Sequence, residues 1–201
     1  MKREKGSALL TTILIIFVLG TIGSALGSFV IYNYKLREHD NKIGRAEYET
    51  EKAVDAVLVQ VKQNYRAVLA YARGEVEAIV DEEFKKGNAI DLNQELYNFL
   101  EDKNNLVYKD ASGNELKLNN FDSGIFNGPQ INKNELIVDN TKNPIEIVNK
   151  IEIIHTGTMP NIKLSLDIVL TIPDFHVIQG DYDVDLYVNI KNYTMQNWGY
   201  L

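Results

Sequence analysis

A run of 29 residues without one charged side chain, from Gly6 to Tyr34, constrains this 201-residue chain more than any other feature. A helix of about 20 apolar residues crosses the hydrocarbon core of a bilayer, so the run is long enough to span a membrane. A secretory signal peptide has a shorter apolar region that ends in a small-residue cleavage site. Because this run is longer and amphipathic sequence follows it directly, we expect a membrane helix that the mature protein keeps.

The basic residues beside the run predict its orientation. Lys2, Arg3 and Lys5 precede it, and positive charges next to a membrane helix favour the cytoplasmic side. Tyr32 and Tyr34 stand at its other end, where aromatic side chains anchor a helix at the membrane surface. We therefore expect a single-pass membrane protein with a cytoplasmic N-terminus and an extracellular C-terminal head.

Small residues recur along one side of the expected helix. Gly20, Gly23 and Gly27, together with Ser24 and Ser28, follow one another at spacings of three and four. Such a stripe lets a second helix approach closely, so the three glycines are candidates for helix packing. An alternative stays open, because glycine and serine are common in membrane helices in general.

The rest of the chain is acidic and contains no cysteine. From Lys35 onward it carries 18 basic and 27 acidic residues, a net charge of -9. A surface of that charge repels phosphate backbones, so we expect no direct nucleic-acid binding. The absence of cysteine excludes a disulfide framework, thiolate metal ligands and a thiol nucleophile.

The leader before the apolar run carries a family resemblance. It reads Met-Lys-Arg-Glu-Lys-Gly6 and is followed at once by Ser7-Ala8-Leu9-Leu10, which resembles a type IV prepilin. The resemblance implies that a prepilin peptidase cuts after Gly6 and methylates Ser7. It further implies that the apolar helix first anchors the subunit in the membrane and later packs against other pilin subunits in the core of a surface filament.

One position narrows the resemblance. Most pilins have Glu at the fifth residue after the cut, and this chain has Thr11 there. That departure is typical of PilX-like minor pilins and K-type pseudopilins, which implies a place in or at the tip of a pilus or pseudopilus. The physical logic agrees, because an unpaired carboxylate in a lipid-like core costs several kcal/mol and a tip subunit has no neighbour to pair with it.

The helical period continues beyond the membrane segment. Apolar residues at spacings of three, four or seven predict an amphipathic helix that ends at Lys85-Lys86-Gly87-Asn88. This predicts four segments: a leader over 1–6, a membrane or filament-core helix over 7–34, an amphipathic helix over 35–88 and a globular head over 89–201. The predicted stripe consists of Ala46, Ala53, Val57, Val61, Val68, Ala72, Val76 and Ile79.

The head reads as a short helix followed by strands. Asp91, with Gln94 in a capping-box-like position, predicts the start of a helix over 92–103. Alternation and turn residues predict a hairpin of 106–109 with 115–118 and later strands over 135–138, 145–155, 163–172 and 182–193, the last three in an antiparallel meander. The fold class is therefore α+β, with a long N-terminal helix packed on an antiparallel sheet as in pilins.

The chain offers no visible catalytic or metal site. His39, His155 and His176 are isolated in sequence, so we expect no enzyme activity, no cofactor and no metal. The segment 181–185 begins like a calcium loop, but Leu186 and Asn192 stand where such a loop needs Gly and Glu. Alternation there favours a solvated strand face instead.

Two function classes follow. The favoured hypothesis is a PilX-like minor pilin that prepilin peptidase processes and that assembles through its N-terminal helix. The alternative is a single-pass, signal-anchored extracellular binding or sensing protein, which would remain uncut. An exported enzyme is a third possibility, without a site to support it.

Overall fold

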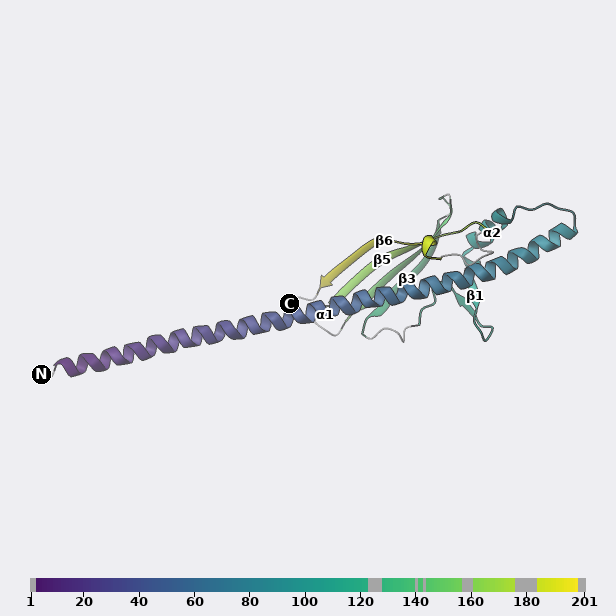
Figure 1. Cartoon of the computed structure of the whole chain (residues 1–201). Coiled ribbons are helices and arrows are strands. Elements are labelled where there is room, and N and C mark those ends of the chain that lie inside the picture. The colour runs from purple at the N-terminus through teal and green to yellow at the C-terminus, as the bar shows by residue number, and fades with distance from the viewer. Residues whose placement is uncertain are drawn as a thin grey trace. The chain divides into compact units, whose positions relative to one another are not determined.

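The computed structural model of this protein describes residues 3–122, 128–139, 141–142, 144–156, 161–175 and 184–198. It has an α+β fold with one long helix, a four-stranded antiparallel sheet and a small two-stranded sheet (Figure 1). The elements are α1 (Arg3–Lys85), α2 (Leu92–Glu101), η1 (Lys103–Asn105), β1 (Val107–Lys109), β2 (Glu115–Lys117), β3 (Gln130–Asp139), β4 (Glu146–His155), β5 (Asn161–Thr171), η4 (Val184–Tyr187) and β6 (Val188–Trp198).

The chain divides into two compact units, Met1–Arg45 and Ala46–Leu201. Helix α1 supplies all the described structure of the first unit and continues into the second. The second unit contains every strand and a hydrophobic core of its own.

The apolar stripe of α1 forms one side of this core. The prediction is confirmed at seven of the eight positions, which are buried, and it is wrong at Ile79, which is 40% exposed. Val76 is the last buried residue of α1, and Val80 is only half-buried, so the helix extends past the core before it ends. Tyr65 also links the helix to β5 by a hydrogen bond, because its hydroxyl donates to the Thr171 carbonyl at 2.7 Å.

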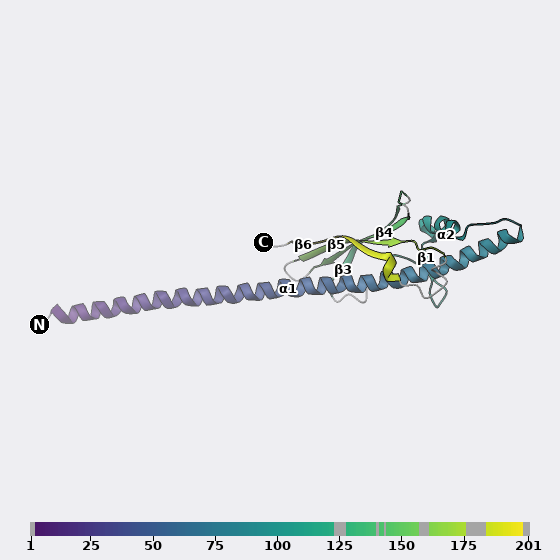
Figure 2. The same ribbon diagram turned by 45° about the horizontal axis from the view of Figure 1, so that its top comes forward.

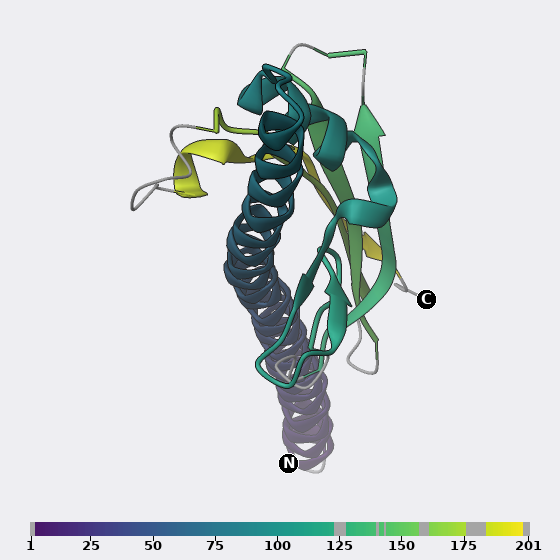
Figure 3. The same cartoon turned by 90° about the vertical axis from the view of Figure 1, so that its right-hand side faces the viewer.

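The large sheet forms the other side of the core. Its strand order is β3-β4-β5-β6 and every neighbour is antiparallel, which confirms the predicted meander of the last three strands and adds β3 at one edge. Alternate residues of β4 and β5, such as Ile147, Ile151, Leu164 and Leu166, are buried in one cluster with the α1 stripe. Figures 2 and 3 show the result as two layers, with the helix lying along one face of the sheet.

Helix α2 begins where the sequence predicts. Asp91 is its N-cap, and the Asp91 carboxylate accepts hydrogen bonds from the backbone N–H groups of Asn93 and Gln94 at 2.9 and 3.3 Å. The Gln94 side chain donates to Asn98 at 2.9 Å instead of completing a capping box. The helix ends at Glu101, two residues before the predicted end, because Asp102 caps the short helix η1.

The predicted hairpin is confirmed. Tyr108 faces Leu116 in the β1–β2 pair, and the Asp110 carboxylate accepts from the backbone N–H groups of Ser112 and Asn114, each at 2.8 Å. These hydrogen bonds, led by one from the Asn114 side chain, lower the pKa of Asp110. Gly113 has φ +82°, a backbone conformation that other residues rarely adopt.

The strand predicted over 182–193 is wrong in its first part. Residues Val184–Tyr187 form η4, and β6 begins at Val188 and runs on to Trp198. The cause lies in the pairing, since Val188 already faces Leu170 near the end of β5 and the residues before it have no strand to pair with. The strand-face interpretation therefore fails at Asp185, while Asp181 and Asp183 lie outside the described residues.

His155 occupies a tight corner at the end of β4. It is 3% exposed, and its Nε2 lies 3.3 Å from Oε2 of Glu49 on α1. Gly128 has φ +108°, and a Cβ added there would lie 2.6 Å from the same Nε2. Only glycine therefore fits at position 128 without displacing the imidazole.

We predict that Gly128→Ala destabilises the head by about 1–3 kcal/mol, because the new Cβ meets His155 and the backbone is strained. Urea unfolding of the full-length protein in zwitterionic micelles measures this change. Gly74→Ala is the matched control, since an added Cβ has open space there and alanine favours the helix by up to about 1 kcal/mol. Equal stability of the two variants would contradict the packing described for Gly128.

Candidate functional site

The described part of the first unit is one helix, and its segment 7–34 is apolar and exposed. Large residues along 7–34 are exposed, including Phe17 at 70% and Phe29 at 62%. Within the described chain this is the one helix long and apolar enough to cross a membrane. A contiguous apolar surface of this size in water would be strongly unfavourable, so the segment is compatible with a membrane anchor.

Five hydroxyl groups of this segment donate hydrogen bonds to the backbone of the same helix. The side chains of Thr11, Thr12, Ser24 and Ser28 each donate to the carbonyl four residues earlier at 2.9 Å. Thr21 donates to the Val18 carbonyl at 2.8 Å. A polar group without a partner is costly in hydrocarbon, so these bonds allow the hydroxyls to enter a lipid environment without water.

The residues of the predicted processing site lie near the start of α1. Gly6 and Ser7 are helical, and Ser7 is exposed. Met1 and Lys2, the first residues of the predicted leader, lie outside the described residues.

The predicted packing glycines share one side of the helix, as their spacing requires. A Cβ built at Gly20, Gly23 or Gly27 has no atom within 4 Å. No contact with the described residues therefore requires glycine at these positions, although each glycine weakens an isolated helix by about 1 kcal/mol relative to alanine. Thr11 stands apart from this stripe, with its hydroxyl turned back to the Ser7 carbonyl.

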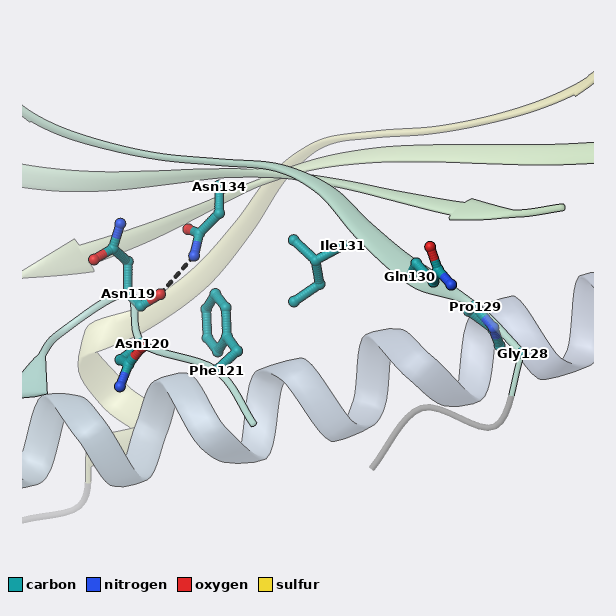
Figure 4. A pocket seen from close by; sticks show the side chains of 8 residues that line it. All are labelled: Asn119, Asn120, Phe121, Gly128, Pro129, Gln130, Ile131 and Asn134. Atoms are coloured by element: carbon teal, nitrogen blue, oxygen red, sulfur yellow. Dashed lines mark hydrogen bonds between the residues drawn. The ribbon is translucent and has the colours of Figure 1, made fainter. Parts of the chain in front are cut away.

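The head contains a second candidate site, a pocket of about 590 Å³ beside strand β3. Three backbone segments line it: the stretch after β2, the stretch before β3, and β3 itself (Figure 4). In this view Phe121 and Ile131 point into the same space, and the Asn134 amide points toward the Asn119 carbonyl. The described lining residues are Asn119, Asn120, Phe121, Gly128, Pro129, Gln130, Ile131 and Asn134.

Asn64 of α1 holds one wall of this pocket in place. It is 8% exposed, and its amide nitrogen donates to the carbonyls of Leu118 and Asn120 at 3.1 and 2.7 Å. Its oxygen accepts from the Tyr108 hydroxyl at 2.8 Å. Burial raises the pKa of Tyr108, with the Asp110 carboxylate as a second cause, so the phenol keeps its proton and remains a donor near neutral pH.

Sequence reasoning did not find this pocket. Asparagines cluster between residues 119 and 134, but asparagine is frequent throughout the chain and the cluster alone indicates a loop. Only the antiparallel fold brings Asn119 beside Asn134, fifteen residues later. The sequence offers one weak indication of the pocket, which is the group of asparagines near Phe121.

The two histidines that the structure describes do not lie together in one site. His39 is half-buried on α1, His155 pairs with Glu49, and His176 lies outside the described residues. Over the parts of the chain that the structure describes, no group of three or more His, Asp or Glu side chains is placed to hold a metal ion.

Comparisons with known proteins return no relative. No protein-family model matches the chain, and neither the curated proteins nor the solved structures provide a match.

We predict that the double variant Ile15→Lys, Ile16→Lys abolishes stable membrane association. Two lysines near the middle of the apolar segment raise the free energy of insertion by about 6 kcal/mol. Alkaline carbonate extraction measures the outcome, with Ile15→Leu, Ile16→Leu as the matched control that stays in the membrane pellet. Pelleting of the lysine variant to the same extent as the control would contradict a membrane location for this segment.

We also predict that Asn64→Ala destabilises the head by about 2–4 kcal/mol, because it removes three hydrogen bonds and leaves the buried Leu118 carbonyl without this donor. Asn98→Ala, on the exposed side of α2, should change stability by less than about 0.5 kcal/mol. Denaturant unfolding of both variants checks the difference, and equal losses would show that Asn64 does not fix the pocket wall.

Proposed function

We propose that this protein is a minor, PilX-like pilin subunit, processed by prepilin peptidase and assembled into or at the tip of a type IV pilus or pseudopilus. The observation that carries the proposal is the position of Gly6, directly before a charge-free helix rather than after it. A cut at Gly6 removes the charged leader and leaves the whole apolar surface in the mature subunit.

The structure of α1 supports this proposal in two ways. Its segment 7–34 exposes apolar side chains and internally bonded hydroxyls, which suits first a bilayer and then a bundle of like helices. Its later part, from Ala53 to Val76, forms one side of the head's core, so a single helix would couple the anchor to the head. Pilins, which the leader resembles, use one helix for the same two purposes.

Thr11 supports the assignment to a minor subunit. Its hydroxyl bonds to the helix backbone, so it needs no partner from another chain. A glutamate at this position would bring a charge that only a neighbouring subunit's N-terminus could neutralise in the filament core. A subunit without that charge can end a filament, and this favours the tip over repeated positions along the shaft.

Intact mass and N-terminal peptide analysis test the proposal. Co-expression with an active prepilin peptidase should yield a protein that lacks residues 1–6 and carries a methyl group on the Ser7 amine. Gly6→Leu should keep the leader, because the enzyme would no longer find its small residue, while Gly20→Leu in the same helix should still be cut.

Retention of Met1–Gly6 by the unaltered chain beside active peptidase would exclude a processed pilin. It would favour the alternative, a signal-anchored extracellular binding or sensing protein.

A further inference from the structure

The segment directly after the apolar run differs in charge from the chain beyond it. Residues 35–45 carry four basic and two acidic side chains, a net charge of +2 with histidine neutral. Residues 46–201 carry 14 basic and 25 acidic side chains, a net charge of -11. Positive charge is therefore concentrated beside the apolar helix, in the side chains of Lys35, Arg37, Lys42 and Arg45.

The two basic residues nearest to the apolar run stand at the height of a membrane surface. Helix α1 continues through residues 35–45 without a break, so each residue adds about 1.5 Å along the axis. Lys35 therefore lies about 1.5 Å beyond Tyr34, the last residue of the charge-free run, and Arg37 about 4.5 Å beyond it. Both side chains are exposed. Their long apolar stems allow the charged ends to reach phosphate groups at the surface of a bilayer.

Lys35 and Arg37 form what we call the basic collar. Two residues apart on an α-helix, they project about 200° from one another around the axis, so the collar can contact lipids on both sides of α1. The nearest carboxylate, that of Glu38, lies farther from the apolar run and pairs with Lys42 at 2.8 Å. Asp40 lies farther still. The charge closest to the membrane surface is therefore positive.

A positive collar at this height complements one class of lipid. An anionic headgroup such as that of phosphatidylglycerol presents a phosphate without a cation, and lysine and arginine bind such phosphates by charge-assisted hydrogen bonds. The choline headgroup of phosphatidylcholine carries its own ammonium group, which repels the collar. An acidic protein would be a less fitting partner, because the collar lies within about one helical turn of the lipid itself.

We propose that the basic collar binds the headgroups of anionic phospholipids, so that phosphatidylglycerol is preferred to phosphatidylcholine around α1. The inference rests on the membrane placement of residues 7–34, and it stands whether or not the leader is cut after Gly6. If the leader is cut as proposed above, Lys2, Arg3 and Lys5 are lost and the collar remains as the basic flank of the membrane helix.

Electron spin resonance of spin-labelled lipids tests the proposal, because lipids in contact with a membrane helix give a motionally restricted signal. The full-length protein is reconstituted in phosphatidylcholine bilayers at low salt and probed with spin-labelled phosphatidylglycerol or phosphatidylcholine. The relative association constant should favour phosphatidylglycerol about fivefold or more, as expected for basic residues at a membrane surface. NaCl at about 1 M should remove most of this preference, since it shortens the screening length to about 3 Å.

The double variant Lys35→Gln, Arg37→Gln should lower the preference about threefold or more. Lys85→Gln, Lys86→Gln is the matched control, because it makes the same change in charge at exposed positions near the other end of α1. The control should keep the preference of the unaltered protein. The leader is the same in all three proteins, so its basic residues do not account for a difference between them.

Equal association of the two lipids with the unaltered protein would overturn the inference, and so would a collar variant that keeps the full preference. An equal loss in the control would assign the preference to total charge instead of the collar. A protein that restricts neither lipid would overturn the inference together with the membrane placement of residues 7–34. The pilin proposal is tested separately by the cut after Gly6, so the two proposals can fail independently.

Discussion

The structure depends on one helix with two different apolar surfaces. One is a stripe along a single face, and the other surrounds the helix. Over residues 46–76 most apolar residues form a single stripe, and the chain covers that stripe with its own sheet. Over residues 7–34 the apolar residues surround the helix, and nothing in the first unit covers them. A helix that is apolar on all sides is stable only when lipid or other helices cover it. The described chain does not cover residues 7–34, so we infer that lipid or another chain does.

Much of the fold could be predicted because its periods are clear. Spacings of three and four located the buried face of α1, and alternation located β4 and β5 close to their observed ends. The failures have local causes. Ile79 continues the stripe, but the sheet no longer covers it, and Val184–Tyr187 alternate like a strand but have no strand to pair with. Both errors arise because the neighbouring sheet or strand ends before these residues. A local sequence pattern does not show where a neighbouring element ends.

The two candidate sites differ in how well they could be predicted from the sequence. The apolar segment is continuous in sequence, so Gly6, Thr11 and the glycine stripe could be named from the sequence. The structure adds the hydrogen bonds that the hydroxyls make to the helix backbone. The pocket is assembled from residues 119–121 and 128–134, which lie together only after the sheet forms. Asn64, far earlier in the chain, fixes its wall. Such a site needs tertiary structure before its chemistry can be seen.

In the topology that we propose, residues 7–34 lie in a membrane and the head lies outside the cell. The chain has no cysteine, so single cysteines can report each position without background. A membrane-impermeant maleimide added to intact cells should label Ser112→Cys in the exposed β1–β2 turn. It should leave Leu19→Cys, within the apolar segment, unlabelled until detergent is added. Labelling of Leu19→Cys in intact membranes, or labelling of Ser112→Cys only after the cells are opened, would contradict the account.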